Sequence, residues 1–329
     1  MTFRHSLEQI REVQSIIAKH LPRTTLKRAT GIFDGGAGVY LKMETELPTA
    51  SFKPRGAFAA LSHRQHESPI SEVTAASSGN HGAAVAWAAK KLGVPATIFL
   101  PANPNPVKRG KIASLGARIV EAGGPDLVHA CLLAQEHSSR PGVYFLNDAT
   151  DPYLPMGPAT IGFEIFEQLP EVRSVFVPMG DTALIRGVST ALKQLEPAIR
   201  IVGVQAERAP SYYLSWKKGA PIRTETCDTC ADGLATRTPE PGNVEAILEL
   251  VDDILLVSEE EMIGAIHSLY ASEGVIAEPS GAASTAAFLK QPHTSGPVVL
   301  LITGANIADD VRARAGLPSE PSARSQTAS

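Results

Sequence analysis

Three short segments of the sequence combine residue types that could do chemistry. The first, Thr49–Ala57, reads T-A-S-F-K-P-R-G-A and places Lys53 between an aromatic residue and a Pro/Gly turn. A lysine must lose its proton before it can form an imine, and partial burial favours the neutral amine. Lys53 is therefore a candidate for imine chemistry, although a lone lysine is more often a solvated surface residue.

The other two segments could bind an anion, because each is predicted to join a strand to a helix. Ser77–Gly82 reads S-S-G-N-H-G and offers hydroxyls and a helix N-terminus at one point, with an ordinary capping loop as the alternative. Pro178–Gly187 reads P-M-G-D-T-A-L-I-R-G, where Gly180 permits an unusual backbone angle. Here the local sequence favours a cap by Asp181 or Thr182 over a phosphate cradle, because an acid opposes phosphate binding.

The elements that position these loops follow from the hydrophobic pattern. Short apolar runs predict strands at residues 39–42, 74–77, 96–100, 117–120, 142–146, 174–178, 199–205 and 298–303. Helical spacing and caps predict helices at residues 6–19, 81–93, 107–116, 125–137, 160–169, 183–195 and 258–272. This alternation predicts an α/β fold of parallel sheets with helices on both faces. Ligands of such folds bind beyond the carboxyl ends of strands, where both anion segments fall.

Composition limits the function classes. The 329 residues are 43% hydrophobic and 19% charged, with a net charge of −4 and no basic run, so we expect no nucleic-acid partner. No apolar stretch approaches the roughly 20 residues that span a bilayer, and the N-terminus lacks the apolar core of a signal peptide. We therefore expect a cytoplasmic protein without a membrane partner.

The cysteines predict no disulfide framework, because there are only three: Cys131, Cys227 and Cys230. The last two form a lone C-x-x-C without a second pair of ligands. We expect reduced thiols in a loop, with zinc binding or redox chemistry as the alternative.

Taken together, the segments resemble the serine/threonine dehydratase branch of the fold-type II pyridoxal-phosphate (PLP) enzymes, which includes threonine ammonia-lyases and serine racemases. The resemblance runs in order from Arg23–Leu26 (R-T-T-L) to Thr303–Asn306 (T-G-A-N), and the pair S-F-K-x-R-G-A and S-S-G-N-H-G is its specific part. It implies PLP as the cofactor, an amino acid as the substrate, and a homodimer.

The resemblance also implies two parallel-sheet α/β domains with the cofactor between them. Residues 1–71 and 150–318 would form a large PLP-binding domain, and residues 72–149 a small domain that closes over the substrate. The small, polar residues 319–329 are expected to be a disordered tail.

Residue roles follow from the same resemblance. The catalytic residues implied are Lys53, as the Schiff-base lysine, and Ser78, as the acid/base on the opposite face in racemases. The cofactor contacts implied are Phe52 beside the ring, Asn80 at the ring hydroxyl, Thr303 facing the pyridine nitrogen, Glu278 nearby in E-P-S-G, and Gly180, Asp181, Thr182, Ala183 and Leu184 in the phosphate loop. The substrate-binding residues implied are Ser77, Ser78, Gly79, Asn80, His81, which is also a candidate base, and Arg237, which could bind a second carboxylate.

The sequence departs from the family pattern in two places. The phosphate loop, normally close to four glycines, reads G-D-T-A here, which predicts a changed backbone path. The carboxylates of the divalent-metal site in serine-racemase-like members are replaced, since the matching positions are Gln205, Ala209 and Ser211. We therefore expect no tight Mg²⁺ or Ca²⁺ site.

The activity implied is an ammonia-lyase (dehydratase) reaction that converts a 3-hydroxy amino acid to a 2-keto acid and ammonia by α,β-elimination. Threonine, serine, phenylserine and 3-hydroxyaspartate present the same reacting atoms. Thr303 supports elimination, because a neutral hydroxyl cannot hold the pyridine nitrogen protonated as a carboxylate can.

Other activities stay open. The alternatives are racemisation of serine or aspartate, which Ser78 keeps open, and PLP-dependent β-replacement. A non-catalytic ligand-binding relative is a further alternative, supported only by the altered phosphate loop. A nicotinamide oxidoreductase fits the alternation but lacks the glycine fingerprint.

Overall fold

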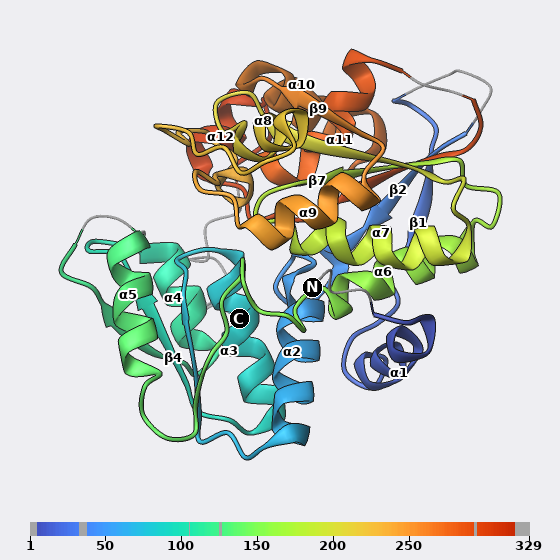
Figure 1. Cartoon of the computed structure of the whole chain (residues 1–329). Helices are drawn as coiled ribbons and strands as arrows, with labels where there is room; N and C mark the ends of the chain where they lie inside the picture. The colour runs from blue at the N-terminus through green and yellow to red at the C-terminus, as the bar shows by residue number, and fades with distance from the viewer. Residues whose placement is uncertain (1–4, 33–37, 105, 125–126, 293–294, 320–329) are drawn as a thin grey trace, which may run out of the picture.

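Two β-sheets, each covered by helices, form the two parts of the molecule (Figure 1). The computed structural model describes residues 5–32, 38–104, 106–124, 127–292 and 295–319. The larger sheet contains, in spatial order, β1 (Leu26–Ala29), β2 (Val39–Met43), β10 (Val298–Ile302), β7 (Ser174–Pro178), β8 (Arg200–Ala206) and β9 (Asp253–Val257). The smaller sheet contains β5 (Arg118–Glu121), β4 (Ala96–Leu100), β3 (Glu72–Ala76) and β6 (Val143–Phe145).

Helices cover both faces of the larger sheet, because alternate strand residues point to opposite sides. In β10, Val298, Leu300 and Ile302 join one hydrophobic core, and Val299 and Leu301 join another. The first core is completed by α10 (Glu259–Glu273), α11 (Pro279–Lys290) and α12 (Asp309–Arg314). The second is completed by α6 (Met156–Gln168), α7 (Ala183–Leu195), α8 (Ser211–Lys218) and α9 (Pro241–Leu250).

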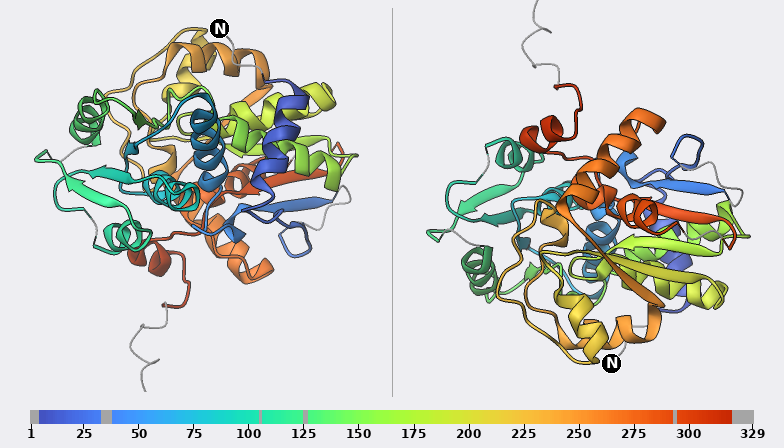
Figure 2. Two further views of the ribbon diagram at one scale, coloured as in Figure 1. Left: turned by 90° about the horizontal axis from the view of Figure 1, so that it is seen from below. Right: turned by 90° about the horizontal axis from the view of Figure 1, so that it is seen from above.

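The smaller sheet is also covered on both faces. One face shares a core with α2 (Lys53–Glu67), α3 (Asn80–Leu92) and α4 (Pro106–Ser114), and α5 (Leu127–His137) packs on the other. Figure 2 shows α2 running between the two sheets. The helix that begins with Lys53 therefore contacts both parts of the molecule, through α3 and through α6.

The sequence locates most elements closely. The strands at residues 96–100 and 174–178 and the helix at residues 183–195 are confirmed to the residue. The helix predicted from residue 258 is confirmed as α10, which begins with a capping box formed by Ser258 and Glu261, and Gly93 ends α3 in the left-handed conformation.

The predicted α/β fold with parallel sheets is confirmed, with one addition: β1 pairs with β2 in the antiparallel sense at the edge of the larger sheet. The predicted Pro/Gly turn after Lys53 is wrong, because Lys53 is the first residue of α2 and Pro54 and Gly56 continue that helix. Proline is tolerated there because the first N–H groups of a helix have no intrahelical acceptor. Of the predicted tail at residues 319–329, residues 320–329 lie outside the described residues.

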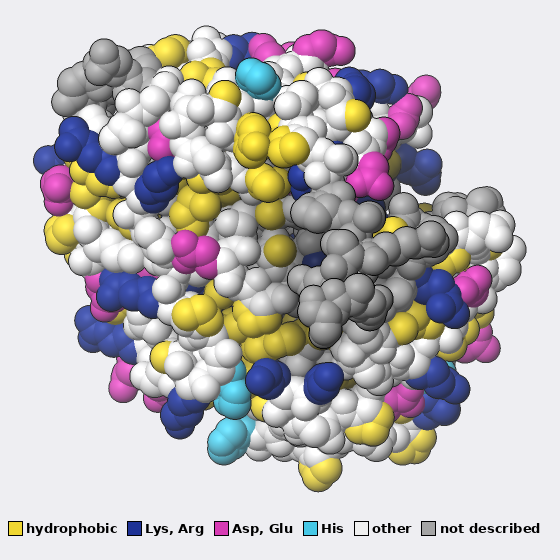
Figure 3. Space-filling view, turned by 180° about the vertical axis from the view of Figure 1, so that it is seen from behind, with side chains coloured by type: hydrophobic (Ala, Val, Ile, Leu, Met, Phe, Trp, Pro, Cys, Tyr) yellow, Lys and Arg dark blue, Asp and Glu magenta, His cyan; other side chains and the backbone are white. Residues whose placement is uncertain are grey.

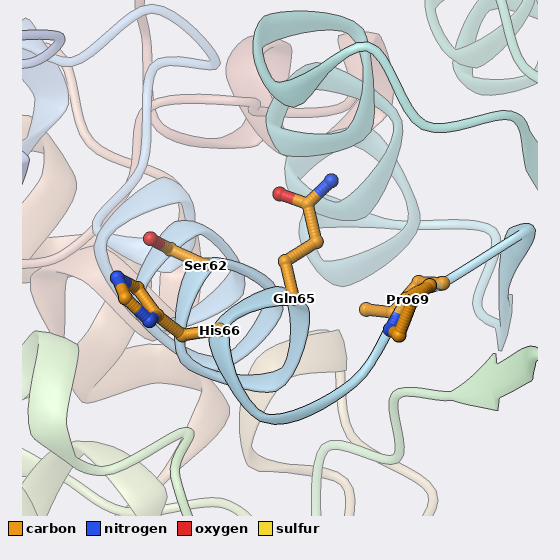
Figure 4. A pocket seen from close by; sticks show the side chains of 5 residues that line it. Ser62, Gln65, His66 and Pro69 are labelled. Carbon is orange, nitrogen blue, oxygen red and sulfur yellow. The ribbon is translucent and has the colours of Figure 1, made fainter.

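On the face in Figure 3, Lys/Arg and Asp/Glu side chains are interspersed rather than gathered by sign. Among the described helices, none is both long enough and apolar enough to cross a bilayer. A hollow of about 600 Å³ lies at the C-terminal end of α2, where Ser62, Gln65 and His66 line it with Pro69 (Figure 4). It contains no predicted site residue.

Candidate active site

Lys53 lies at the junction of the two sheets, on the first turn of α2. The residues before it are fixed to the end of β10, because Phe52 N donates to Thr303 O over 3.0 Å and Ser51 pairs with Gly304. The Lys53 side chain is 19% exposed, and its Nζ lies 5.2 Å from the centre of the Phe52 ring. The lysine amine is thus accessible but held in a partly apolar setting.

Asp148 is a site residue that sequence reasoning missed. Its Oδ2 accepts a hydrogen bond from Lys53 Nζ, and its Oδ1 lies 3.5 Å from His81 Nδ1. Burial acts to raise the pKa of Asp148, but the charge and the hydrogen bond of Lys53 hold it below the usual value. The feature that could have identified Asp148 is its position just after β6, at the carboxyl end of a parallel strand.

His81 is a buried neighbour of this pair. The ring is 5% exposed, and Nε2 lies 3.0 Å from the Leu146 carbonyl oxygen. Burial lowers the pKa of His81, partly offset by Asp148. This environment favours a neutral imidazole that donates through Nε2.

Asn80 and Glu278, far apart in the sequence, are brought together. Asn80 Nδ2 donates to Glu278 Oε1 over 2.7 Å, and Asn80 Oδ1 accepts from Asn306 Nδ2 over 2.6 Å. Asn306 also bonds to the Thr49 carbonyl oxygen, at 2.9 Å. This chain of amides joins the start of α3 to the segment before Lys53 and to the start of α11.

The environment of Glu278 predicts a pH-dependent stability. Burial raises the pKa of this carboxyl from 4.5 to about 7, against the lowering effect of the Asn80 hydrogen bond. A raised pKa means that the stabilisation is complete below pH 4.5 and is lost as the pH rises through about 7. In cofactor-free protein, we expect Glu278→Gln to raise the free energy of unfolding at about pH 8 by on the order of 2 kcal/mol, because the amide carries no charge.

Urea unfolding of the two proteins across this pH range measures the effect. The wild-type stability should fall between about pH 5 and pH 8 more steeply than that of Glu278→Gln. Parallel curves would contradict the assignment of this titration to Glu278.

The G-D-T-A loop differs from the expectations in two respects. Gly180 does not adopt a positive φ; instead, a Cβ there would collide with the Gly233 carbonyl oxygen, so close backbone approach explains the glycine. Thr182 is the N-cap residue of α7, but neither its side chain nor that of Asp181 makes a capping hydrogen bond. Asp181 Oδ1 accepts from Thr236 Oγ1 over 3.0 Å, and burial raises the pKa of Asp181 to about 6. Thr182 has φ +69°, a left-handed conformation that favours glycine.

The remaining predicted site residues are placed as follows. Ser77, Ser78 and Gly79 form the loop before α3, where Ser77 Oγ accepts from Gly79 N over 3.2 Å. Thr303 is 4% exposed and lies at the end of β10. Ala183 and Leu184 are the first two residues of α7 and are buried. Arg237 differs from all of these, because it is the one predicted site residue whose side chain is exposed among those described.

Arg55 of the S-F-K-P-R-G segment belongs to a buried charge cluster beneath the site. Its guanidinium is 1% exposed and bonds to Glu44 Oε2 at 2.8 Å and Glu164 Oε1 at 2.7 Å. Lys42 Nζ, also buried, bonds to Glu164 Oε2 at 2.6 Å. Two cations and two carboxylates thus tie the start of α2 to β2 and α6.

The metal and cysteine positions take structural roles. Gln205 Oε1 accepts from Tyr213 N over 2.9 Å, and Ser211 Oγ donates to the Thr236 carbonyl oxygen over 2.6 Å. Within the described residues, no three His, Cys, Asp or Glu side chains are grouped to hold a metal ion. Burial, with Glu259 nearby, raises the pKa of Cys230 to about 12, which disfavours the thiolate that zinc and redox chemistry require.

These residues fit a phosphorylated aldehyde cofactor. Lys53 supplies an accessible amine, and the first N–H groups of α7 have no side-chain cap to compete with a phosphate. Close by, Arg186 Nη2 is a buried donor without a partner. The fold and these residues define the class: a fold-type II PLP-dependent enzyme, in which Lys53 is the residue that would hold the cofactor.

Comparison with known proteins agrees. The family model described as "Pyridoxal-phosphate dependent enzyme" matches residues 17–304. The chain belongs to this family of PLP-dependent enzymes.

Similar proteins fall in the predicted branch. The chain is 38% identical to the L-threonine ammonia-lyase of Thermotoga maritima over 306 residues, covering 92% of this chain and 76% of the relative. It is 34% identical to a catabolic L-threonine dehydratase of Staphylococcus aureus, covering 92% and 89%. Among solved structures, maize serine racemase is similar, with a TM-score of 0.88, 29% identity and coverage of 95% and 97%. The processed form of threonine deaminase isoform 2 from Solanum lycopersicum has a TM-score of 0.86, 29% identity and coverage of 96% and 94%.

Proposed function

We propose that this enzyme is an ammonia-lyase that converts a 3-hydroxy amino acid, with threonine as the first candidate, to a 2-keto acid and ammonia. The observation that carries the proposal is the Lys53 amine at the junction of the sheets, beside Asp148 and the Asn80–Glu278 pair. The names and identities of the two curated relatives support the reaction class.

Different residues would act at different steps of the reaction. Bound PLP supplies an electron sink for the electrons left at Cα. Lys53 Nζ takes the α-proton, and Asp148 Oδ2 holds the resulting ammonium by the hydrogen bond it already makes. The 3-hydroxyl leaves as water by taking up a proton, which the Lys53 ammonium can return. The enamine released then takes up water in solution and yields the keto acid and ammonia.

The remaining roles are assigned as proposals. The loop of Ser77, Ser78, Gly79 and His81 would bind the substrate carboxylate at the start of α3. Asn80 would contact the cofactor's ring hydroxyl, Phe52 its ring, and Thr303 its pyridine nitrogen. Arg237, which is exposed, would reach a substrate's second carboxylate only by turning inward.

Keto-acid release across a substrate set tests the proposal. The set contains L- and D-serine, both threonine diastereomers, 3-hydroxyaspartate and phenylserine, each added to PLP-loaded enzyme. We expect keto acid and ammonia in equal amounts from at least one of them, with L-threonine as the first candidate. Absence of keto acid from all of them would contradict the lyase assignment.

Racemisation is the second candidate, favoured by the similarity to maize serine racemase. Ser78 would then serve as the acid/base on the face opposite Lys53. Chiral analysis of the recovered amino acid in the same assays separates the two activities. Appearance of the enantiomer without keto acid would establish the racemase.

Three further features are proposals that rest on the resemblance. Residues 72–149, which contain the smaller sheet, would close over the substrate, and residues 1–71 and 150–318 would hold PLP. The chain would act as a cytoplasmic homodimer. A solution mass of twice the 34.8 kDa chain would support the dimer.

A further inference from the structure

Arg186 carries a buried positive charge that the protein leaves largely unpaired. It lies in the first turns of α7 and is 6% exposed. Its Nε donates to Thr182 Oγ1 over 3.1 Å, and its Nη2 is buried without a partner. Within the part of the chain that the structure describes, Arg186 forms no ion pair.

This arrangement is costly unless something else binds the guanidinium. Burying a cation without an acceptor is strongly unfavourable, which is why buried charges are normally paired. Burial lowers the pKa of Arg186, whereas the nearby Tyr212, Asp181 and Asp148 act to raise it.

The nearby acceptors make no hydrogen bond to Arg186, although Asp148 Oδ1 is also buried without a hydrogen-bond partner. Asp148 Oδ2 accepts from Lys53, and its Oδ1 lies 3.5 Å from the His81 ring. Asp181 Oδ1 accepts from Thr236, and the Tyr212 hydroxyl oxygen from Asn243. An acceptor from outside the chain would satisfy the free donors of Arg186.

The guanidinium lies where an anion would be bound. Helical side chains lean toward the N-terminus, and the contact with Thr182, the N-cap residue, places Arg186 beside the start of α7. The first N–H groups of this helix have no side-chain cap. A helix N-terminus and a buried arginine donor therefore converge on one spot, as oxyanion recognition requires.

We propose that Arg186 binds the phosphate of the cofactor, as a side-chain ligand added to the backbone N–H groups at the start of α7. This inference rests on the PLP site of the proposed function. It also explains the acid in the G-D-T-A loop. The Asp181 carboxylate is engaged by Thr236, and Arg186 offsets its charge, while Thr182 orients the guanidinium.

A comparison of PLP with pyridoxal, which lacks the phosphate, tests the inference. Cofactor-free wild type, Arg186→Met and Arg186→Lys are titrated with each compound, followed by visible absorbance. We expect Arg186→Met to raise the Kd for PLP by about 10- to 100-fold, as for a lost charge-assisted hydrogen bond, and the Kd for pyridoxal by less than about 2-fold. The Kd of Arg186→Lys for PLP should lie between those of wild type and Arg186→Met. Arg28→Met, at an exposed arginine on β1, is the matched control and should leave both constants unchanged.

Thermal unfolding gives a second measurement without the aldehyde. Inorganic phosphate should raise the Tm of the cofactor-free wild type more than that of Arg186→Met. Without phosphate, the Tm of Arg186→Met should equal or exceed that of wild type, because the variant lacks an unpaired buried charge.

Several outcomes would overturn the inference while leaving the lyase proposal intact. One is an equal PLP affinity of wild type and Arg186→Met. Another is an equal loss of PLP and pyridoxal binding, which would indicate a structural role. If Arg186→Met had a raised KM for the amino-acid substrate and an unchanged Kd for PLP, the guanidinium would be assigned to substrate binding. Failure of the wild type itself to bind PLP would instead overturn the proposed function, and this inference with it.

Discussion

Replacement of Lys53 by alanine is expected to abolish both turnover and the visible absorbance of bound PLP. The methyl group can neither link to the cofactor aldehyde nor take the α-proton, so one change removes two functions. We expect turnover to fall by more than about 10⁴-fold, beyond the roughly 10²- to 10⁴-fold that a single acid/base group contributes. Keto-acid release and the visible spectrum measure the two effects separately.

Lys90→Ala is the control for this variant. Lys90 is exposed near the end of α3, so its loss should change neither the spectrum nor the rate. Added methylamine, which can replace a missing lysine amine from solution, should restore part of the activity of Lys53→Ala but not affect Lys90→Ala. Near-wild-type turnover of Lys53→Ala would remove Lys53 from the catalytic site.

Lys53 could be singled out from the sequence because it lies in one of two short motifs that occur in a fixed order. The S-F-K-x-R-G-A and S-S-G-N-H-G segments are contiguous, so their order and spacing can be read directly. The hydrogen-bond partner of Lys53 could not be found in this way. Asp148 lies 95 positions away, and its contact depends on how β6 ends relative to the start of α2. No local pattern in N-D-A-T indicates that contact.

The expectations for the loop before α7 were wrong for a related reason. Asp181 and Thr182 are good capping residues in isolation, which favoured a cap. In the structure Asp181 bonds to Thr236, 55 positions away, and Thr182 to the Arg186 side chain. Side-chain donors, one distant in the sequence and one a single helical turn away, engage these two oxygens in place of the helix N–H groups, and single-residue propensity does not contain that information.

The elements missed by periodicity have a similar cause. α2 and α11 each have proline in the first turn and contain glycine and several small residues, so they resemble loops in sequence. Both helices are buried along much of their length, and tertiary packing stabilises them where propensity is weak. The fold class could be predicted because it requires only the alternation of strongly apolar strands with helices.

Removal of Arg55 is expected to produce the largest loss of stability. Arg55→Met would leave Glu44 and Glu164 with only Lys42 as a buried counter-ion, although all four charges are balanced in the wild type. Breaking a buried ion cluster by removing one partner costs about 3–5 kcal/mol. We expect a decrease of this size in the free energy of unfolding at neutral pH, measured by urea denaturation.

Arg64→Met is the matched control, because it removes an arginine from the same helix. Arg64 is 42% exposed on its side chain and pairs with Glu67 at 3.1 Å on the surface. Its loss should change stability by less than about 0.5 kcal/mol. A similar loss in both variants would contradict the argument that burial makes the Arg55 cluster important.

The pH dependence gives the sign of the effect. Burial acts to raise the pKa of Glu164, but Arg55 and Lys42 hold it below the usual value. Stability from this pairing is therefore present at neutral pH and is lost as the pH falls through the lowered pKa. Without Arg55 the carboxylates lose their strongest partner, so the loss of stability in Arg55→Met should be largest near pH 7 and smaller in acid.

Adding Glu44→Gln to Arg55→Met should recover part of the lost stability, because it removes the uncompensated charge. Failure of the double variant to recover stability would show that packing of the arginine, rather than its charge, secures the helix that carries Lys53.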